Sequence, residues 1–399
     1  MTFLATAARC EMQPPIALGK LFRNRPKTGG IESWFPDSEI HFTYKGRTAI
    51  RHLCDLLDLR GSEVLMPAYN CGAEIEPLIR GGARIVPYRV DKSATADIED
   101  IRKLISDKTR AVHVTHYFGF PQPIDEIRKV CDRHRLFLIE DCALALFSAW
   151  QDRKLGSWGD VSIFSLPKSI PVPDGGVLVI NSPRLQSWEW KKRSAPLLSA
   201  TRRSLSLFKS SLFRKRPLDN HPDRIDSELQ DGVPIGVPME EWYSSPEVRG
   251  TDGLPDVPGW MHYEETFTDR TLSWFSAHLL RGVDEDEIIK TRRRNYLCLA
   301  SLLSGRPGFT LLYKMLPPGV CPLGLPLVCR DRESLCRHLS MRGITAAIWW
   351  PGFDRNMDWD RFQEARFLKN HVLLLPAHQG LGEKDMEYIA HAVATLNSQ

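Results

Sequence analysis

Apolar and polar residues follow two alternating spacings through the first half of the chain. Short apolar runs of the kind that form buried strands cover 64–67, 84–88, 111–114 and 136–139. Apolar residues recur at helical spacing over 48–59, 74–81, 98–105 and 124–134. Strands that alternate with helices predict an α/β fold with a mostly parallel sheet flanked by helices on both faces. Two later strands are expected at 161–164 and 177–180.

The pattern changes on both sides of this region. Residues 1–37, rich in proline, glycine and basic side chains, predict an N-terminal arm ahead of a large domain at 38–262. Within that domain we expect a basic insertion at about 183–260, where the alternation of strands and helices breaks. A long helix from near Leu272 is expected to open the last unit, 263–399, and mixed strands and helices predict a smaller C-terminal α+β domain there.

Composition argues against several classes of protein and of site. A chain of 399 residues can bury a large core, and its formal net charge of +4 is too small to indicate a nucleic-acid-binding protein. The nine cysteines are scattered without a Cys-x-x-Cys pair, so neither a zinc site nor a disulfide framework is indicated. No apolar run approaches the roughly 20 residues that a membrane-spanning helix needs. No secretory signal is recognisable, and we expect a cytoplasmic protein.

The strongest chemical signal is the pair Asp141 and Lys168. Asp141 ends an apolar strand, and Lys168 follows 27 positions later in a loop that leads to Gly175 and Gly176. In an open α/β sheet, ligands bind outside the carboxyl ends of the strands. Pyridoxal phosphate needs an amine for its aldehyde and an anion at its ring nitrogen, so the pair suits this cofactor. Taken singly, Lys168 is as easily a surface lysine and Asp141 a helix cap.

Several short motifs occur in order around this pair. They are Gly-Arg-Thr-Ala at 46–49, Val-Leu-Met-Pro-Ala-Tyr at 64–69, His-Tyr-Phe-Gly at 116–119, Ile-Glu-Asp-Cys-Ala at 139–143, Gly-Asp at 159–160, Phe-Ser at 164–165 and Gly-Gly at 175–176. Through their order and spacing the chain resembles the DegT/DnrJ/EryC1/StrS family, pyridoxal-phosphate-dependent sugar aminotransferases of fold type I. The resemblance implies that Lys168 binds the cofactor covalently and moves a proton, while Asp141 holds the proton on the ring nitrogen.

The resemblance also implies a phosphate site. Gly46, Thr48 and Ala49 would wrap the cofactor phosphate at a helix N-terminus, where free N–H groups and the helix dipole favour an anion. Ser165 aligns with a serine that hydrogen-bonds the phosphate, although it could instead only tie its loop. Arg47 stands where the family often has a small residue, and either adds a charge to the phosphate or points to solvent.

Around the ring, the resemblance leaves alternatives and shows departures. Tyr69 and Cys71 lie where the family places the residue that covers the ring face; Tyr69 would stack better, and Cys71 aligns better. His116 aligns with a family histidine near the cofactor, and a buried histidine with satisfied hydrogen bonds is the alternative. Leu144 replaces the usual Gln or His, so one ring-side hydrogen bond is missing. Thr266–Ser273 replaces the segment by which a partner subunit reaches the phosphate.

The function implied by the resemblance is transfer of an amino group, from a donor such as glutamate, to a keto-sugar that is usually nucleotide-linked. The family's active site implies a homodimer. Two alternatives stay open. One is another pyridoxal-phosphate reaction on a sugar, against which Lys168 argues because the family's dehydratases carry histidine there. The other is a catalytically silent homologue that binds the cofactor or a partner as a regulator.

The basic insertion has its own alternatives. Residues 184–217 hold ten basic side chains and one acidic one. A solvated charged face is the default interpretation of such a run. Trp188 and Trp190, together with a helical apolar stripe that includes Leu205 and Phe208, suggest weak contact with an anionic membrane surface. The same apolar groups could instead pack on the protein's own body.

Overall fold

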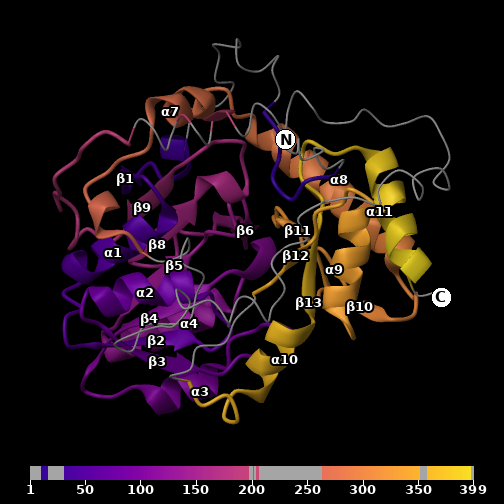
Figure 1. The fold of residues 1–399 in the computed structure, drawn as a ribbon. Helices are drawn as coiled ribbons and strands as arrows, with labels where there is room; N and C mark the ends of the chain where they lie inside the picture. The colour runs from indigo at the N-terminus through magenta and orange to yellow at the C-terminus, as the bar shows by residue number, and fades with distance from the viewer. Residues whose placement is uncertain are drawn as a thin grey trace, which may run out of the picture.

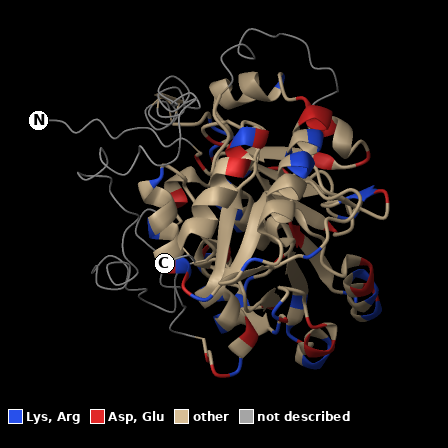
Figure 2. Ribbon diagram, turned by 90° about the vertical axis from the view of Figure 1, so that its right-hand side faces the viewer, with Lys and Arg blue, Asp and Glu red and all other residues tan. Residues whose placement is uncertain are grey.

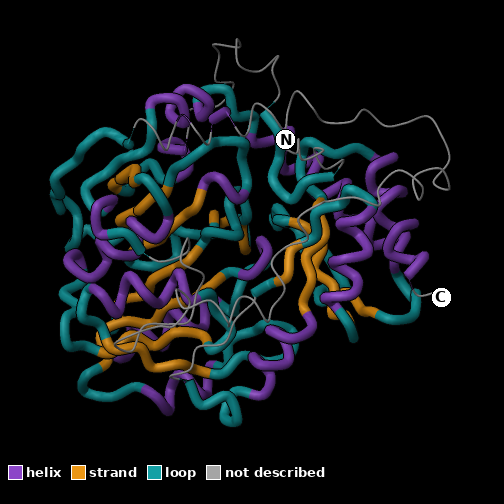
Figure 3. Tube along the Cα trace, in the orientation of Figure 1, coloured by secondary structure: helices purple, strands orange, loops and turns teal. Residues whose placement is uncertain are grey.

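The computed structural model describes residues 10–16, 31–196, 201, 204–205, 263–350 and 357–396. Two separate sheets organise this part of the chain, a seven-stranded one on the left of Figure 1 and a four-stranded one on the right. Figure 3 shows helices packed around both sheets. The first sheet is built from strands between residues 39 and 180 and the second from strands between residues 309 and 376; the parts of the chain around them are called the large and the small domain below.

The large sheet carries the predicted strands in a mostly parallel arrangement. In spatial order its strands are β1 (Glu39–Thr43), β9 (Gly176–Ile180), β8 (Val161–Ser165), β5 (Phe137–Asp141), β4 (Thr109–Thr115), β2 (Glu63–Pro67) and β3 (Arg84–Tyr88). The five strands from β8 to β3 are parallel, which confirms the sequence-based expectation. β9 runs antiparallel to β8, and β1 antiparallel to β9. Parallel neighbours need a crossover of a dozen or more residues, and the link between Ser165 and Gly176 is shorter than that.

Helices cover both faces of the large sheet because its central strands bury side chains on both sides. The helices are α1 (Gly46–Leu56), α2 (Gly72–Arg80), α3 (Ile98–Leu104) and α4 (Ile124–His134). Successive strand residues point to opposite faces. In β5, Ile139 joins the core beneath α1 and α2, whereas Leu138 joins the core that contains α4 and continues into the small domain. Short 3-10 turns, η2 (Ile31–Trp34), η3 (Tyr117–Gly119) and η4 (Leu166–Lys168), complete this half.

The small domain is built on an antiparallel sheet, as an α+β unit requires. Its strands are β10 (Phe309–Leu311), β11 (Gly324–Cys329), β13 (Val372–Pro376) and β12 (Ala347–Ile348), in that spatial order. Its helices are α8 (Glu285–Leu303), α9 (Arg332–Met341), α10 (Gln363–His371) and α11 (Glu383–Leu396). A minor hairpin, β6 (Ala149–Trp150) with β7 (Arg153–Lys154), and the turn η8 (Glu265–Phe267) lie in the large half.

The single long helix expected from near Leu272 is wrong. Two helices occupy this region, α7 (Trp274–Leu280) and α8, separated by a link that contains Gly282. Ser273 caps α7 by accepting a hydrogen bond from the Ser276 N–H at 3.2 Å. Asp284 caps α8 in the same way, from the Glu287 N–H at 3.1 Å. A capping side chain starts a new helix, so the chain can turn between the two.

Part of the predicted arm packs on the small domain. Cys10 is fully buried, donates its N–H to the Gly343 carbonyl at 3.0 Å and accepts from the Thr345 N–H at 2.8 Å. The described residues of the arm therefore bridge to the C-terminal domain. Most of the arm, 1–9 and 17–30, lies outside the described residues.

The start of the basic insertion packs on the large domain. The Trp188 ring centroid lies 5.7 Å from that of His41 and 5.1 Å from that of His52, and the Trp190 centroid lies 4.4 Å from that of His52. These two tryptophans therefore contact the protein's own body. Of the rest of the insertion, Leu205 is described and exposed, while Phe208 lies outside the described residues.

Charge is mixed over the described part of the chain. Figure 2 shows Lys and Arg interspersed with Asp and Glu along the ribbon. Among the helices that the structure describes, none combines the length and the apolar character that crossing a membrane requires.

Candidate functional site

Asp141 and Glu140, at the end of β5, have different surroundings. Asp141 is 1% exposed, pairs in register with Thr115 of β4, and accepts a hydrogen bond from the Ala143 N–H through Oδ1 at 2.8 Å. Its second oxygen, Oδ2, is buried and has no hydrogen-bond partner among the described residues. His113 Nε2 lies 3.9 Å from Oδ2. A buried carboxylate oxygen with an unused acceptor position suits a cationic N–H donor of a ligand.

Lys168 lies in η4, directly after the end of β8. Its side chain is half-buried, with Nζ 5.9 Å from the centroid of the Trp349 ring of the small domain. Its loop folds back onto the start of α1, because the Gly175 N–H donates to the Tyr44 carbonyl at 2.9 Å. A Cβ on Gly176 would lie 2.4 Å from the backbone carbonyl of Lys45. Only glycine permits that approach, which explains the Gly-Gly pair of the sequence.

The structure brings the predicted phosphate residues together. An added Cβ on Gly46 would lie 3.3 Å from Ser165 Cβ, so the start of α1 and the end of β8 meet. The N–H groups of Thr48 and Ala49 both donate to the Lys45 carbonyl, at 3.0 and 3.3 Å. Thr48 Oγ1, in contrast, is buried without a hydrogen-bond partner in the described chain. Lys45 offers no side-chain cap to α1, and the helix N-terminus therefore remains available to an anion.

Both ring nitrogens of His116 have hydrogen-bond partners within the protein. Its Nδ1 accepts from the Gln122 N–H at 3.0 Å, so Nε2 carries the proton and donates to Glu140 Oε2 at 3.0 Å. Glu140 also accepts from the Gly156 N–H at 2.9 Å and the Gly159 N–H at 2.5 Å. The structure favours the interpretation of His116 as a satisfied buried histidine.

His113 is the histidine that faces Asp141, and the sequence analysis missed it. Both of its ring nitrogens are buried without a hydrogen-bond partner in the described part of the chain. Burial lowers the pKa of His113, with Asp141 acting in the opposite direction. Strand alternation could have revealed it, because His113 and Thr115 share one face of β4 and Thr115 is in register with Asp141.

Tyr69 and Cys71, the two candidates for covering the ring face, differ in their packing and hydrogen bonds. Tyr69 is fully buried, donates its hydroxyl to the Trp349 carbonyl, and packs with ring centroids 5.1 Å from Tyr117 and 5.2 Å from Trp350. Cys71 is the N-cap residue of α2. Burial raises the pKa of Cys71 to about 11, and the Lys168 ammonium opposes that rise. Because Tyr69 is already packed against Tyr117 and Trp350 and hydrogen-bonded to Trp349, Cys71 is the better candidate of the two.

Glu74, in the first turn of α2, is a second residue that the sequence analysis missed. It is 6% exposed, and its Oε2 has no hydrogen-bond partner among the residues described. Burial, and then the charge of Asp141, raises the pKa of Glu74 to about 8, while Lys168 opposes the rise. An acidic residue at the start of a helix is ordinarily a solvent-exposed partner of the helix dipole, so the sequence carried no signal of this position.

Arg292 of α8 holds the Lys168 loop from the opposite side. It is 1% exposed, and burial lowers its pKa. Its guanidinium donates to the Ser169 carbonyl at 2.8 Å, to the Pro322 and Leu323 carbonyls at 3.1 and 3.0 Å, and to Gln379 Oε1 at 2.7 Å. Ser169 directly follows Lys168, so Arg292 ties the reactive loop to the small domain.

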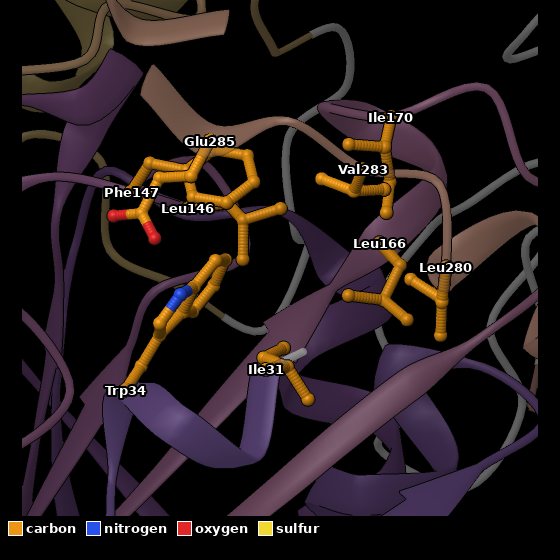
Figure 4. A pocket seen from close by; sticks show the side chains of 9 residues that line it. All are labelled: Ile31, Trp34, Leu146, Phe147, Leu166, Ile170, Leu280, Val283 and Glu285. Atoms are coloured by element: carbon orange, nitrogen blue, oxygen red, sulfur yellow. The ribbon is translucent and has the colours of Figure 1, made fainter. Parts of the chain in front are cut away.

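Behind the same loop lies a small apolar cavity of about 20 Å³. Figure 4 shows its lining, in which Leu166 and Ile170 of the Lys168 loop face Leu280 and Val283, with Ile31, Trp34, Leu146, Phe147 and Glu285 around them. Glu285 is ion-paired with Lys154. The cavity is too small for a phosphorylated ring and supplies the apolar backing of the loop.

Leu144 is buried in the large core and offers no polar atom. Thr266–Ser273 packs against the start of α1 within the same chain. The Tyr44 N–H donates to the Arg270 carbonyl at 2.9 Å, and Lys45 Nζ lies 4.7 Å from the centroid of the Phe267 ring. This segment therefore lies close to the candidate phosphate site.

A protein-family model and several known proteins match part of the chain. Residues 44–194 match the model of the DegT/DnrJ/EryC1/StrS aminotransferase family. GDP-perosamine synthase of Vibrio cholerae is 37% identical over 126 residues, 31% of this chain and 34% of that protein. The dTDP-3-amino-3,4,6-trideoxy-alpha-D-glucose transaminase of Streptomyces venezuelae is 31% identical over 129 residues, again 31% of this chain and 34% of that protein. The chain thus aligns with about a third of the length of these relatives.

Solved structures match nearly the whole chain. DesI, crystallised in the presence of its TDP-sugar product, has a TM-score of 0.67 at 17% identity and covers 99% of this chain and 95% of its own. Helicobacter pylori PseC, an aminotransferase of pseudoaminic acid biosynthesis, has a TM-score of 0.65 at 17% identity over 97% and 98%. The expected fold type I is confirmed by these likenesses. Over residues 44–194, the chain is similar to the DegT/DnrJ/EryC1/StrS aminotransferase family.

Proposed function

We propose that the protein is a pyridoxal-phosphate-dependent aminotransferase that moves an amino group, from a donor such as glutamate, to a nucleotide-linked keto-sugar. The observation that carries the proposal is one sheet edge with three features: the free Asp141 Oδ2, the Lys168 amine, and the Gly46–Ser165 contact beside Thr48. The names of the two relatives, a GDP-perosamine synthase and a dTDP-sugar transaminase, support a sugar substrate.

The residues present fit pyridoxal phosphate on chemical grounds. Asp141 Oδ2 is an unused anionic acceptor for a ring N–H, and Lys168 is the amine that an aldehyde needs. Thr48 Oγ1 is an unused hydroxyl at an uncapped helix N-terminus, which suits a phosphate. The ring nitrogen, the aldehyde and the phosphate thus each have a residue of matching chemistry at the same edge of the sheet.

The chain's own residues have separate tasks. When bound, the cofactor supplies a ring that accepts electrons from the reacting carbon. Asp141 would hold a proton on the ring nitrogen through Oδ2. Lys168 would bind the cofactor through Nζ and move the proton that the reaction releases. Arg292 donates to the Ser169 carbonyl, directly after Lys168, and would so restrain the position of the lysine.

The test of this assignment is chemical labelling of the lysine. Borohydride reduction of the protein with pyridoxal phosphate should fix the cofactor on the peptide that contains Lys168, and Lys168→Ala should abolish both label and transamination. Lys369 provides an internal control, because it is a buried lysine whose Nζ donates to the carbonyl of Asn70, next to Cys71, at 2.8 Å. Label on Lys369 instead, or full turnover in Lys168→Ala, contradicts the proposal. A bound cofactor whose absorbance does not change with glutamate or a panel of amino donors would support the silent homologue.

We further propose a cytoplasmic homodimer. The exposed Trp274, 80% accessible on α7, follows the segment that packs beside Lys45, and an isologous contact there would bury it. Sedimentation equilibrium distinguishes a dimer from an active monomer.

We also propose weak membrane contact through 184–217. The residues after Trp190 would make that contact, since Trp188 and Trp190 pack on His52. Salt-sensitive flotation with anionic vesicles tests it.

A further inference from the structure

Glu74 has no part in the mechanism above, yet it lies at the same sheet edge as the residues that do. It follows β2 in the first turn of α2, and Asp141 ends β5; both strands are parallel to β4, which lies between them. Glu74 is buried and its Oε2 has no hydrogen-bond partner among the described residues. A buried carboxyl oxygen without a partner is costly, and such a group is retained where a ligand completes it.

The charged groups around Glu74 come from three other elements. Asp141 of β5 raises the pKa of Glu74 after the larger effect of burial, whereas Lys168 of η4 and Lys369 of α10 lower it. Within α2, the Cys71 carbonyl accepts the Glu74 N–H at 2.9 Å. Glu74 is therefore within electrostatic range of Asp141, Lys168 and Lys369.

The order of strands tells which edge of a bound cofactor Glu74 faces. Ser165, the candidate phosphate residue, ends β8 on one side of β5, while Glu74 follows β2 on the other side. In pyridoxal phosphate, the carbon that bears the aldehyde has the phosphate arm on one side and the phenol oxygen on the other. With the ring nitrogen at Asp141 and the aldehyde at Lys168, the side away from Ser165 is the phenol edge.

We propose that Glu74 is a further cofactor-binding residue, whose carboxyl donates a hydrogen bond to the phenol oxygen of pyridoxal phosphate. The inference rests on the proposed function, because it assumes that the cofactor lies between Asp141 and Lys168. The step is a hydrogen bond in which no covalent bond forms or breaks. The carboxyl must carry its proton to donate, and the cofactor's phenol oxygen accepts.

The decisive experiment compares the dissociation constant of pyridoxal phosphate at pH 6.5 and pH 9.5 in wild type and Glu74→Gln. An amide donates at both pH values, whereas the carboxyl loses its proton as pH rises through about 8. The ratio of the wild-type to the Glu74→Gln dissociation constant should therefore rise about tenfold or more between the two pH values, since one unit of pKa shift on binding corresponds to tenfold in affinity. Glu99→Gln is the matched control, because Glu99 is exposed on α3 and pairs only with Arg102 there; it should follow wild type.

Each other outcome has a distinct meaning. A ratio that does not change with pH, or one that falls, overturns the donor role of Glu74. The phenol edge is tested with pyridoxal phosphate methylated at its phenol oxygen: the pH-dependent ratio should largely disappear, and its persistence overturns the edge assignment. If wild type binds no pyridoxal phosphate at either pH, the proposed function itself fails, which separates the two failures.

The cofactor-free protein gives an independent readout. The pKa of Glu74 is raised in the folded state from 4.5 to about 8, so folding retains a proton that the unfolded chain loses. Stability from this group is complete below pH 4.5 and is lost progressively as pH rises to about 8. Glu74→Gln cannot lose that proton, so its melting temperature should gain on wild type between pH 5 and pH 9. A constant difference overturns the protonated carboxyl.

Discussion

The two faces of the sheet at the end of β5 differ in how completely their polar atoms are used. On one face, Glu140 accepts hydrogen bonds from His116, Gly156 and Gly159, and both of its oxygens are occupied. On the other, Asp141 uses Oδ1 alone, and Oδ2 has no hydrogen-bond partner among the described residues. Both side chains are buried carboxyls one residue apart. A buried carboxylate whose oxygens all have partners within the protein stabilises the fold. One with an oxygen that lacks such a partner can accept a hydrogen bond from a ligand.

The largest effect that this comparison predicts is on turnover in Asp141→Asn. An amide carries no charge with which to hold the ring-nitrogen proton, so we expect kcat/KM to fall at least about 10³-fold, equivalent to about 4 kcal/mol of transition-state stabilisation. The fold should persist, because an amide oxygen can still accept from the Ala143 N–H. Steady-state kinetics with a thermal melt measure both quantities.

The contrast between Asp141 and Glu140 is contradicted if Asp141→Asn lowers stability and leaves turnover nearly unchanged. If Asp141→Asn keeps turnover within about tenfold of wild type while losing several kcal/mol of stability, Asp141 is a structural carboxylate like its neighbour, and the ring nitrogen pairs elsewhere.

For Glu140→Gln we expect the reverse, a loss of stability with little change in cofactor affinity. An amide has one acceptor oxygen, so its NH₂ group must face the Gly159 N–H or the pair formed by His116 and the Gly156 N–H. Buried donors left without an acceptor cost about 1–3 kcal/mol each, and we expect the free energy of unfolding to fall by about 2–4 kcal/mol. Chemical denaturation measures the loss. Pyridoxal phosphate affinity of the folded variant should stay within about threefold of wild type, and a larger change would place Glu140 in the pocket.

The sequence could predict much of this arrangement because apolar patterning and strand ends carry it. The five parallel strands β8, β5, β4, β2 and β3 followed from short apolar runs, and Asp141 followed from its place after one of them. β1 escaped prediction because Glu39–Thr43 has no continuous apolar run, and its buried side chains are the polar His41 and Thr43. The direction of β9 depends on the length of the Lys168 loop, which sequence periodicity does not weigh.

The sequence analysis missed site residues whose surroundings come from elements far away in the sequence. Glu74 and His113 are ordinary in local sequence, and come near Asp141 only when β2, β4 and β5 assemble into one sheet. His116 was expected near the cofactor from its family position, whereas its hydrogen bonds to Glu140 and Gln122 depend on tertiary packing. Hydrogen-bond satisfaction is a property of the folded chain, so no spacing rule can supply it.

The smallest predicted effect concerns Thr48, a second unsaturated group, at the start of α1. Thr48→Val replaces Oγ1, which lacks a partner in the described chain, by a methyl group of similar size, so the cofactor-free protein should be as stable as wild type or about 1 kcal/mol more stable. If Oγ1 donates to the cofactor phosphate, the same change should weaken pyridoxal phosphate binding about tenfold, or about 1.4 kcal/mol, measured by absorbance titration. Pyridoxal without its phosphate is the control ligand, and its affinity should not change. Equal losses for both ligands would mean that Thr48 supports the pocket without touching the phosphate, and a stability loss of several kcal/mol would make Oγ1 a saturated group after all.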